Sequence, residues 1–254
     1  MITGNKQYYI GCSGWNYKHW KGLFYPETIP RYRWLQYYAS IFTTVEINAT
    51  FYRQFKDATY TNWYNRVPNE FCYSLKLSRY ITHVKRLLHV EDAIQRCVTS
   101  ASLLKNKLGV IVIQLPPSLK FDEQFVGDFL LLLPSNYRYA IEARHGSWLC
   151  DSCFSLLKQH NIAWCIADTA SRYPYHEVVT ANFVYIRLHG SKKLYASEYT
   201  MQELEEWANK IIAWDKITYC YFDNDVNAYA VFNALSLKRL LHVTSPLPCS
   251  EFTV

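Results

Sequence analysis

Short runs rich in β-branched and aromatic residues recur along the whole chain, and each is followed by a polar or amphipathic connector. Runs of this length and composition predict buried β-strands. Eight can be counted, at residues 8–12, 43–48, 71–77, 110–115, 138–143, 162–167, 183–188 and 218–222. Their mean spacing of about 30 residues leaves room for a crossover helix after most strands.

Helical periodicity fills most of the connectors. The clearest predicted helix spans 92–108, where apolar residues return every three or four positions and Gly109 follows as a stop. Another begins at Thr200, because Thr200 and Glu203 have the spacing of a capping box. Further helices are expected at 32–41, 57–65, 123–133, 151–160 and 227–241, whereas 169–182 is expected to be mostly loop.

Eight repeats of strand and crossover in a chain of 254 residues predict an α/β fold, a single-domain (β/α)8 TIM-like barrel. An open doubly wound sheet is the alternative. No low-complexity tract or linker divides the sequence, so one domain is expected over 1–254. Its core is expected at about 8–241, with 242–254 as a C-terminal tail.

Alternation within each strand separates positions that face the helices from positions that face the barrel interior. In the fifth run, Ile141 and Ala143 can face the helices, which leaves Glu142 and Arg144 inside. The same reasoning applied to the other runs predicts a polar inner set near the carboxyl ends of the strands: Glu46, Asn48, Ser74, Lys76, Gln114, Glu142, Arg144, Asp168, Arg187, His189 and Asp223. Active sites of this fold lie at that end.

The inner set admits several interpretations. Carboxylates and an imidazole can act as general acids and bases, so the candidate catalytic residues are Glu46, Asn48, Glu142, Asp168 and His189. Glu142, Asp168 and His189 are also candidate ligands of a divalent metal ion, although no short metal-binding motif is present. A third interpretation is a binding pocket without catalysis. The structural alternative is a self-neutralising ion-pair network that fills the barrel mouth.

Basic residues could hold an anionic substrate at the same end. The segment 76–89 adds Arg79 and His83 to Lys76 directly after the third strand, and such a cluster suits a phosphate or a nucleic-acid backbone. A solvated basic loop is the alternative. The candidate substrate-binding residues are Trp15, Tyr17, Lys76, Arg79, His83, Gln114, Arg144 and Arg187. For the aromatic segment 14–25 we expect packing against the barrel more than contact with a ligand.

Net charge and cysteine content bear on the partners and the cellular compartment of the protein. The formal net charge of +6 favours anionic partners without requiring nucleic acid. Eight cysteines lie scattered in apolar segments, a pattern typical of reduced thiols in a cytoplasmic protein. No apolar run is long enough to span a bilayer, so no membrane association is expected.

Seven ordered motifs resemble one known family: GCSGWNYKHWKGLFYP, VEINATFYR, KLSRYITH, LGVIVIQLPPS, IEARHGSW, YIRLHG and YFDND. The chain is similar to the YecE-like family, also called domain of unknown function 72. The resemblance implies a TIM-like barrel whose activity is not established. It also adds Asn224 to the candidate binding residues, and it marks Asp223 as a departure, because the family usually has asparagine at this position.

Together these patterns predict an enzyme that acts on an anionic substrate such as a phosphate ester or a nucleic-acid backbone, a hydrolase of the phosphoesterase or nuclease kind. In this hypothesis Lys76, Arg144 and Arg187 hold the anion, while Glu142, Asp168 and His189 handle protons or a cation. A non-catalytic nucleic-acid- or metabolite-binding protein is one alternative. A sugar or sugar-phosphate isomerase is the other.

Overall fold

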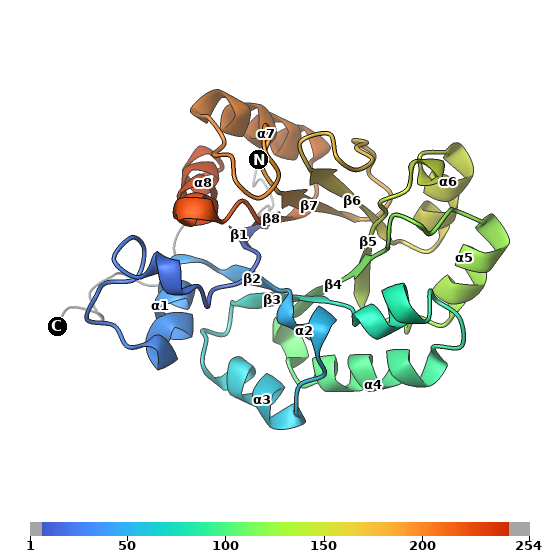
Figure 1. Cartoon of the computed structure of the whole chain (residues 1–254), viewed down its shortest axis with the longest axis horizontal. Helices are drawn as coiled ribbons and strands as arrows, with labels where there is room; N and C mark the ends of the chain where they lie inside the picture. Colours follow the sequence, from blue (N-terminus) through green and yellow to red (C-terminus); the bar gives the residue numbers. More distant parts are fainter. Residues whose placement is uncertain (1–6, 244–254) are drawn as a thin grey trace, which may run out of the picture.

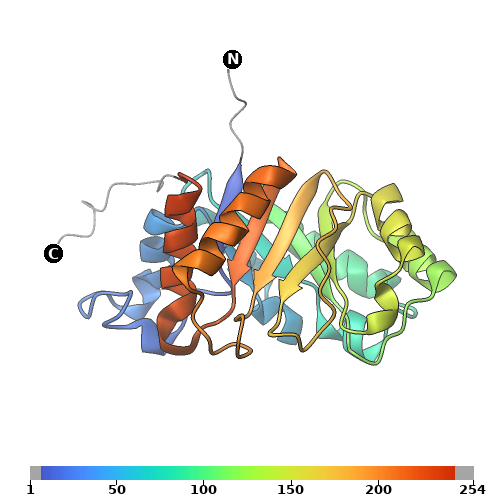
Figure 2. The same ribbon diagram turned by 90° about the horizontal axis from the view of Figure 1, so that it is seen from above.

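Eight parallel strands form the centre of the molecule. The computed structural model describes residues 7–243. The strands are β1 (Tyr8–Cys12), β2 (Thr44–Ile47), β3 (Cys72–Lys76), β4 (Leu108–Gln114), β5 (Arg138–Glu142), β6 (Ala163–Asp168), β7 (Phe183–Leu188) and β8 (Ile217–Phe222). Their order, β1-β8-β7-β6-β5-β4-β3-β2, brings the first and last members of the sheet round to each other, and all run in one direction (Figure 2). The predicted (β/α)8 barrel is confirmed, and the open doubly wound sheet is excluded.

The ring closes between β1 and β2 through a side chain. No backbone ladder joins these two strands within residues 7–243. Instead, the hydroxyl of Tyr38 accepts a hydrogen bond from the Cys12 amide at 2.9 Å and donates one to the Thr44 carbonyl at 3.0 Å. Gly11 permits this approach, because a Cβ there would lie only 2.4 Å from the Thr44 oxygen.

Helices surround the strands on the outside of the barrel (Figure 1). They are α1 (Trp34–Ile41), α2 (Ala49–Tyr52), α3 (Asp57–Asn65), α4 (Glu91–Ser102), α5 (Glu123–Leu131), α6 (Asp151–Gln159), α7 (Met201–Trp214) and α8 (Tyr229–Leu240). The capping box at Thr200 is present, and residues 169–182 contain no helix or strand, as predicted. None of the helices within residues 7–243 is long and apolar enough to cross a membrane.

The helix predicted at 92–108 is the main difference from expectation. Helix α4 ends at Ser102, and β4 already begins at Leu108. Gly109 therefore lies inside a strand, where an added Cβ would come within 2.4 Å of the Cys72 sulfur. The glycine serves close packing across the barrel interior and does not end a helix.

The barrel interior is filled by large side chains on one side and small ones on the other. Tyr185 and Tyr221 enter from β7 and β8, and small residues face them from β5 and β6, namely Ala140, Ala163, Cys165 and Ala167. Tyr221 keeps its buried hydroxyl satisfied through Thr44 at 2.7 Å and Ser74 at 2.8 Å. This packed layer supports the polar residues at the carboxyl ends of the strands.

Candidate functional site

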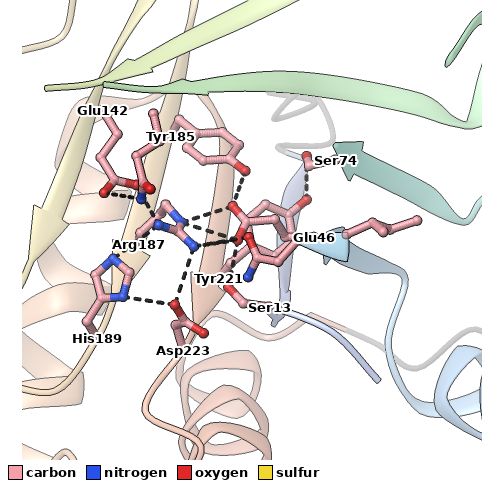
Figure 3. Close-up of polar contacts among 12 residues, drawn as sticks. Ser13, Glu46, Ser74, Glu142, Tyr185, Arg187, His189, Tyr221 and Asp223 are labelled. Atoms are coloured by element: carbon pink, nitrogen blue, oxygen red, sulfur yellow. Dashed lines mark hydrogen bonds and ion pairs between the residues drawn. The ribbon is translucent and has the colours of Figure 1, made fainter. Parts of the chain in front are cut away.

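Arg187, on β7, is the centre of the polar cluster at the barrel mouth (Figure 3). Its Nε lies 3.0 Å and its Nη2 2.8 Å from carboxylate oxygens of Glu46, and its Nη1 lies 2.5 Å from Oε2 of Glu142. All three residues are at most 2% exposed. Burial alone would lower the pKa of Arg187, but the two glutamates raise it well above the ordinary value. The guanidinium is therefore permanently charged.

Glu46, on β2, is saturated by hydrogen bonds. Besides Arg187, Oε1 accepts from the Ser13 hydroxyl at 2.7 Å and Oε2 accepts from the Tyr185 hydroxyl at 2.6 Å. A buried carboxylate is tolerated when each lone pair finds a donor, and here the donors come from the end of β1 and from β7. No lone pair of the Glu46 carboxylate is therefore left free to accept a hydrogen bond from a ligand.

Glu142, on β5, is held in its ionised form. Oε1 accepts from the Gln114 amide at 2.7 Å and lies 3.0 Å from Nη2 of Arg144. Burial would raise the pKa of Glu142, but Arg187 and then Arg144 pull it well below the ordinary range. This carboxylate therefore cannot serve as a proton donor near neutral pH.

His189 lies under the mouth between an arginine and an aspartate. Nη1 of Arg187 is 3.3 Å from Nε2, and because a guanidinium only donates, Nε2 must accept. The ring proton then resides on Nδ1, which lies 3.0 Å from Oδ2 of Asp223, although without the alignment of a good hydrogen bond. The pKa of Asp223 is lowered by His189 and Arg187 against the effect of burial. His189 is fully buried, with Nε2 in contact with Arg187 and Nδ1 close to Asp223 but without a hydrogen bond.

For this part of the mouth, these contacts favour the interpretation as an ion-pair network over the interpretation as an anion-binding site. The Arg187 cluster, made of Arg187, Glu46, Glu142, His189 and Asp223, is an ion-pair network that fills this part of the mouth. Its three carboxylates outnumber its one arginine, and Arg144 offsets part of the excess by pairing with Glu142. Arg187 itself has no donor left for a substrate anion, contrary to expectation, because Asp223 lies 3.4 Å from Nη2, which also bonds Glu46. Asn48 approaches the same Nη2 only at 3.5 Å.

Unused cationic donors lie on the side of the mouth above β3 and β5. We call Lys76, Arg79, His83 and Arg144 the cationic side. The ammonium of Lys76 lies 4.2 Å from the centre of the Phe51 ring, and no hydrogen bond or ion pair occupies it within the described chain. Arg144 stacks on Tyr173 at 4.4 Å and uses Nε and Nη2 for Glu142, which leaves Nη1.

The pKa of His83 indicates a positive electrostatic potential on the cationic side. Its pKa is lowered to about 4, first by burial and then by the positive charges of Lys76, Arg144 and Arg79. The imidazole is therefore neutral at physiological pH. Three cations that disfavour a fourth positive charge create a place suited to an anion.

An open pocket of about 540 Å³ lies on the other side of the mouth, above β8. Its lining includes Tyr17, His19, Tyr195, Asp223 and Asp225, and we call His19, Asp223 and Asp225 the acidic side. Nε2 of His19 lies 3.1 Å from Oδ2 of Asp225, whose Oδ1 accepts from the Trp20 indole at 2.6 Å. Burial raises the pKa of Asp225 to about 6, despite the Trp20 bond. This group titrates within reach of neutral pH.

Asp168 does not point into the barrel, so its predicted orientation is wrong. On β6, Ala167 pairs with the inward Arg187, whereas Asp168 pairs with the outward Leu188. Its carboxylate accepts from the Tyr199 hydroxyl at 2.8 Å on the helix-facing surface of the sheet. Burial raises its pKa. Glu142, Asp168 and His189 therefore do not converge on a common metal ion.

Within residues 7–243 the structure shows no other group of three His, Cys, Asp or Glu side chains placed to hold a metal. A bound divalent ion stays a prediction.

Asn224 also faces away from the mouth. Its amide nitrogen donates to the Ser197 carbonyl at 2.9 Å and to Asn233 of α8 at 2.8 Å. The side chain ties the loop before α7 to α8, so the structure gives it a connecting position and not a place against a ligand. Outward parity after Phe222 accounts for this position.

The aromatic segment behaves as a packed loop, with one exception. Trp15 packs edge-on against Trp63 at 5.9 Å, and Trp20 is fully buried. Tyr17 lines the open pocket while its hydroxyl donates to the Ser13 carbonyl. Sequence reasoning missed His19 and Tyr195. His19 lies in a single 3-10 turn and Tyr195 in a loop turn, neither of which has a periodic pattern, so only their position in the pocket identifies them.

The fold and the site define a single-domain (β/α)8 barrel with a buried ion-pair network below a divided polar mouth. The family model "protein of unknown function DUF72" matches residues 9–251, and the chain belongs to this family. The UPF0759 protein YecE of Escherichia coli K12 is 25% identical, with 84% of each chain covered. The UPF0759 protein YunF of Bacillus subtilis strain 168 is 24% identical over 92% of this chain and 95% of that one.

Solved structures agree with this assignment. A DUF72 family protein from Thermotoga maritima, TM1631, is 26% identical and superposes with a TM-score of 0.84 over 93% of this chain and 99% of its own. A DUF72 family protein from Enterococcus faecalis, EF0366, is 19% identical with a TM-score of 0.81, covering 94% and 96% of the two chains, and shows the shared fold.

Proposed function

We propose that this protein is an enzyme that acts on a small phosphate ester at the barrel mouth. The observation that carries the proposal is the pair of unused cationic donors, Nζ of Lys76 and Nη1 of Arg144, beside a network in which every other buried charge is paired. Such donors suit a phosphate that arrives with its own negative charge.

The acidic side supplies the proton chemistry in this proposal. Asp225, with a pKa of about 6, can exchange a proton with a leaving group near neutral pH, and His19 contacts it directly. Tyr195 lines the pocket, and the charges of both Asp223 and Arg144 act on its pKa. A volume of about 540 Å³ favours a small molecule over a polynucleotide.

The test is phosphate binding by calorimetry, followed by turnover of a panel of phosphate esters between pH 5 and 8. We expect Arg144→Gln to weaken binding of inorganic phosphate at least about tenfold, since a charge-assisted hydrogen bond contributes about 1.5–3 kcal/mol. Arg138→Gln is the matched control, because Arg138 begins β5 at the opposite end of the barrel, whereas Arg144 follows the end of this strand. Asp225→Asn should keep phosphate binding and lose turnover.

Two results would contradict the proposal. Equal phosphate affinity in wild type and Arg144→Gln would show that Arg144 does not bind the phosphate. Phosphate binding without turnover of any ester would instead indicate a non-catalytic binding protein, and steeply salt-dependent binding of oligonucleotides would point to nucleic acid.

A further inference from the structure

Lys76 is the one cation at the mouth whose surroundings suit a nucleophile. It ends β3, and the residue as a whole is 6% exposed. Its ammonium has no carboxylate within ion-pair distance in the described part of the chain, although Glu46 and Glu142 are close enough to act on its charge. The ε-nitrogen is not among the unpartnered side-chain atoms of residues 7–243 that are closed off from solvent, so it keeps some contact with solvent.

The position of Lys76 is built by the short helix α2. Thr50 donates from its hydroxyl to the Lys76 carbonyl at 2.7 Å and to the Ile47 carbonyl at 3.0 Å, which fixes α2 to the ends of β2 and β3. The next residue, Phe51, then presents its ring to the ammonium at 4.2 Å. A ring face directs the amine without accepting its proton in a hydrogen bond.

Lys107 shows what a structural buried lysine looks like in the same chain. It is 3% exposed and also lies over an aromatic ring, Tyr64, at 4.4 Å. Its ε-nitrogen, however, donates to the Tyr64 carbonyl at 2.7 Å and the Val67 carbonyl at 2.8 Å. Lys76 also lies over an aromatic ring, but no carbonyl accepts a hydrogen bond from its ε-nitrogen, so this nitrogen is available to react with a ligand.

Burial and the Arg187 charge lower the pKa of Lys76 to about 8, with Arg144 adding to the effect and Glu142 and Glu46 opposing it. Near pH 8 the neutral amine is then on the order of 100-fold more abundant than for an ordinary lysine.

We propose that Lys76 attacks a carbonyl carbon of the substrate and forms an imine, so that the substrate is an aldehyde or ketone that also carries a phosphate. This inference rests on the proposed function for the phosphate, which Arg144 then holds alone. It assigns Lys76 a covalent role in place of a purely electrostatic one.

The step balances without any further reactant. The lone pair of Nζ forms the N–C bond while the C=O π pair moves to oxygen, which gives a carbinolamine after proton transfer from nitrogen to oxygen. Solvent then protonates the carbinolamine hydroxyl, and the nitrogen lone pair forms the C=N bond as this group leaves as water. The iminium returns the remaining N–H proton to solvent, so one water is released for each imine formed.

The experiment traps the imine with borohydride, which delivers hydride to the imine carbon while water protonates nitrogen. The probes are pyridoxal 5′-phosphate and pyridoxal, which share the aldehyde and differ in the phosphate. Intact protein is labelled between pH 6 and 10, and peptide mass spectrometry locates the secondary amine. Lys76→Arg is the variant, with its thermal unfolding measured alongside.

We expect Lys76 to be labelled by the phosphorylated probe at least tenfold faster than Lys107 or any other lysine, with a pH profile that levels off above about pH 8. Inorganic phosphate should slow this labelling, and folded Lys76→Arg should lack it. The pH profile of the wild-type protein decides the matter even if the variant fails to fold.

Labelling spread over other lysines with Lys76 unmodified, or a rate at Lys76 that keeps rising to pH 10, would overturn the proposal. Rapid labelling of Lys76 by both probes, unaffected by phosphate, would support the nucleophile and contradict the phosphate site, so the two proposals fail separately.

Discussion

The two buried cations of the barrel mouth, Arg187 and Lys76, are influenced by the same glutamates but have opposite environments. Arg187 is surrounded by Glu46, Glu142 and Asp223, and the pKa of its guanidinium is raised. Lys76 has no carboxylate at ion-pair distance within residues 7–243, and the pKa of its ammonium is lowered by burial and by Arg187. All the donors of Arg187 are used in ion pairs and hydrogen bonds, whereas the ammonium of Lys76 has none of either within residues 7–243.

The difference between Arg187 and Lys76 indicates which charges of such a network can bind a ligand. A charge whose donors are all used stabilises neighbours of opposite sign, and a ligand would have to displace those neighbours. A charge with unused donors is costly for the fold and available to a ligand. The ion-pair network therefore accounts for the charges around β7, and the functional interpretation is our proposal for β3.

The largest expected effect comes from breaking the saturated side. Arg187→Met leaves Glu46 and Glu142 buried without their shared cation, so the free energy of unfolding should fall by about 3–5 kcal/mol. Urea denaturation measures this loss. Arg138→Gln, with an exposed arginine, should cost less than about 0.5 kcal/mol. A loss below about 1 kcal/mol for Arg187→Met would show that the network does not stabilise the fold.

A smaller effect is expected from pH at the unsaturated side. The folded-state pKa of Lys76, about 8, lies below its ordinary value of 10.5, so below pH 8 the folded state carries the full cost of the buried ammonium. That cost disappears as pH rises from 8 to 10.5, because the unfolded chain alone still binds the proton. Relative to Lys76→Met, wild type should gain up to about 3 kcal/mol over this range.

Denaturation of both proteins at a series of pH values gives the difference, in which contributions of the other titrating groups cancel. A constant difference from pH 7 to 10.5 would mean that Lys76 ionises as it does in water and that the two cations are alike.

The smallest effect is expected from Asp168→Asn, which tests whether Asp168 belongs to the site. Asp168→Asn keeps an acceptor for the Tyr199 hydroxyl and removes a carboxylate whose pKa burial has raised, so stability should change by less than about 1 kcal/mol at pH 7. Phosphate affinity should stay within twofold of wild type. A tenfold loss of affinity would place Asp168 at the mouth after all and contradict its outward orientation.

Alternation along single strands predicted most of the inner face. Glu46, Glu142 and Arg187 all lie inside, as the apolar residues on either side of them indicate. The expectation is wrong at β6, where Asp168 lies on the helix-facing side. Counting by two from Trp164 and Ile166, which pack on the helix side, gives the outward position that the structure shows.

The interior of β6 explains why a carboxylate is absent there. Its inward positions are Ala163, Cys165 and Ala167, because Tyr185 from β7 occupies the space in front of them. Complementary volumes across the barrel are set by residues on different strands, so no pattern within one strand reveals them.

The amino-acid sequence by itself determined the number of strands, their common direction, and most of the side chains that face the interior, because these depend on periodicities of two and 3.6 that are local to each segment. Only the tertiary structure decided which charges are paired. Arg187 meets Glu46 from 141 positions away, and His19 meets Asp225 from 206 positions away. Pairing depends on distances of a few ångströms between strand ends, and the closure of the barrel sets those distances.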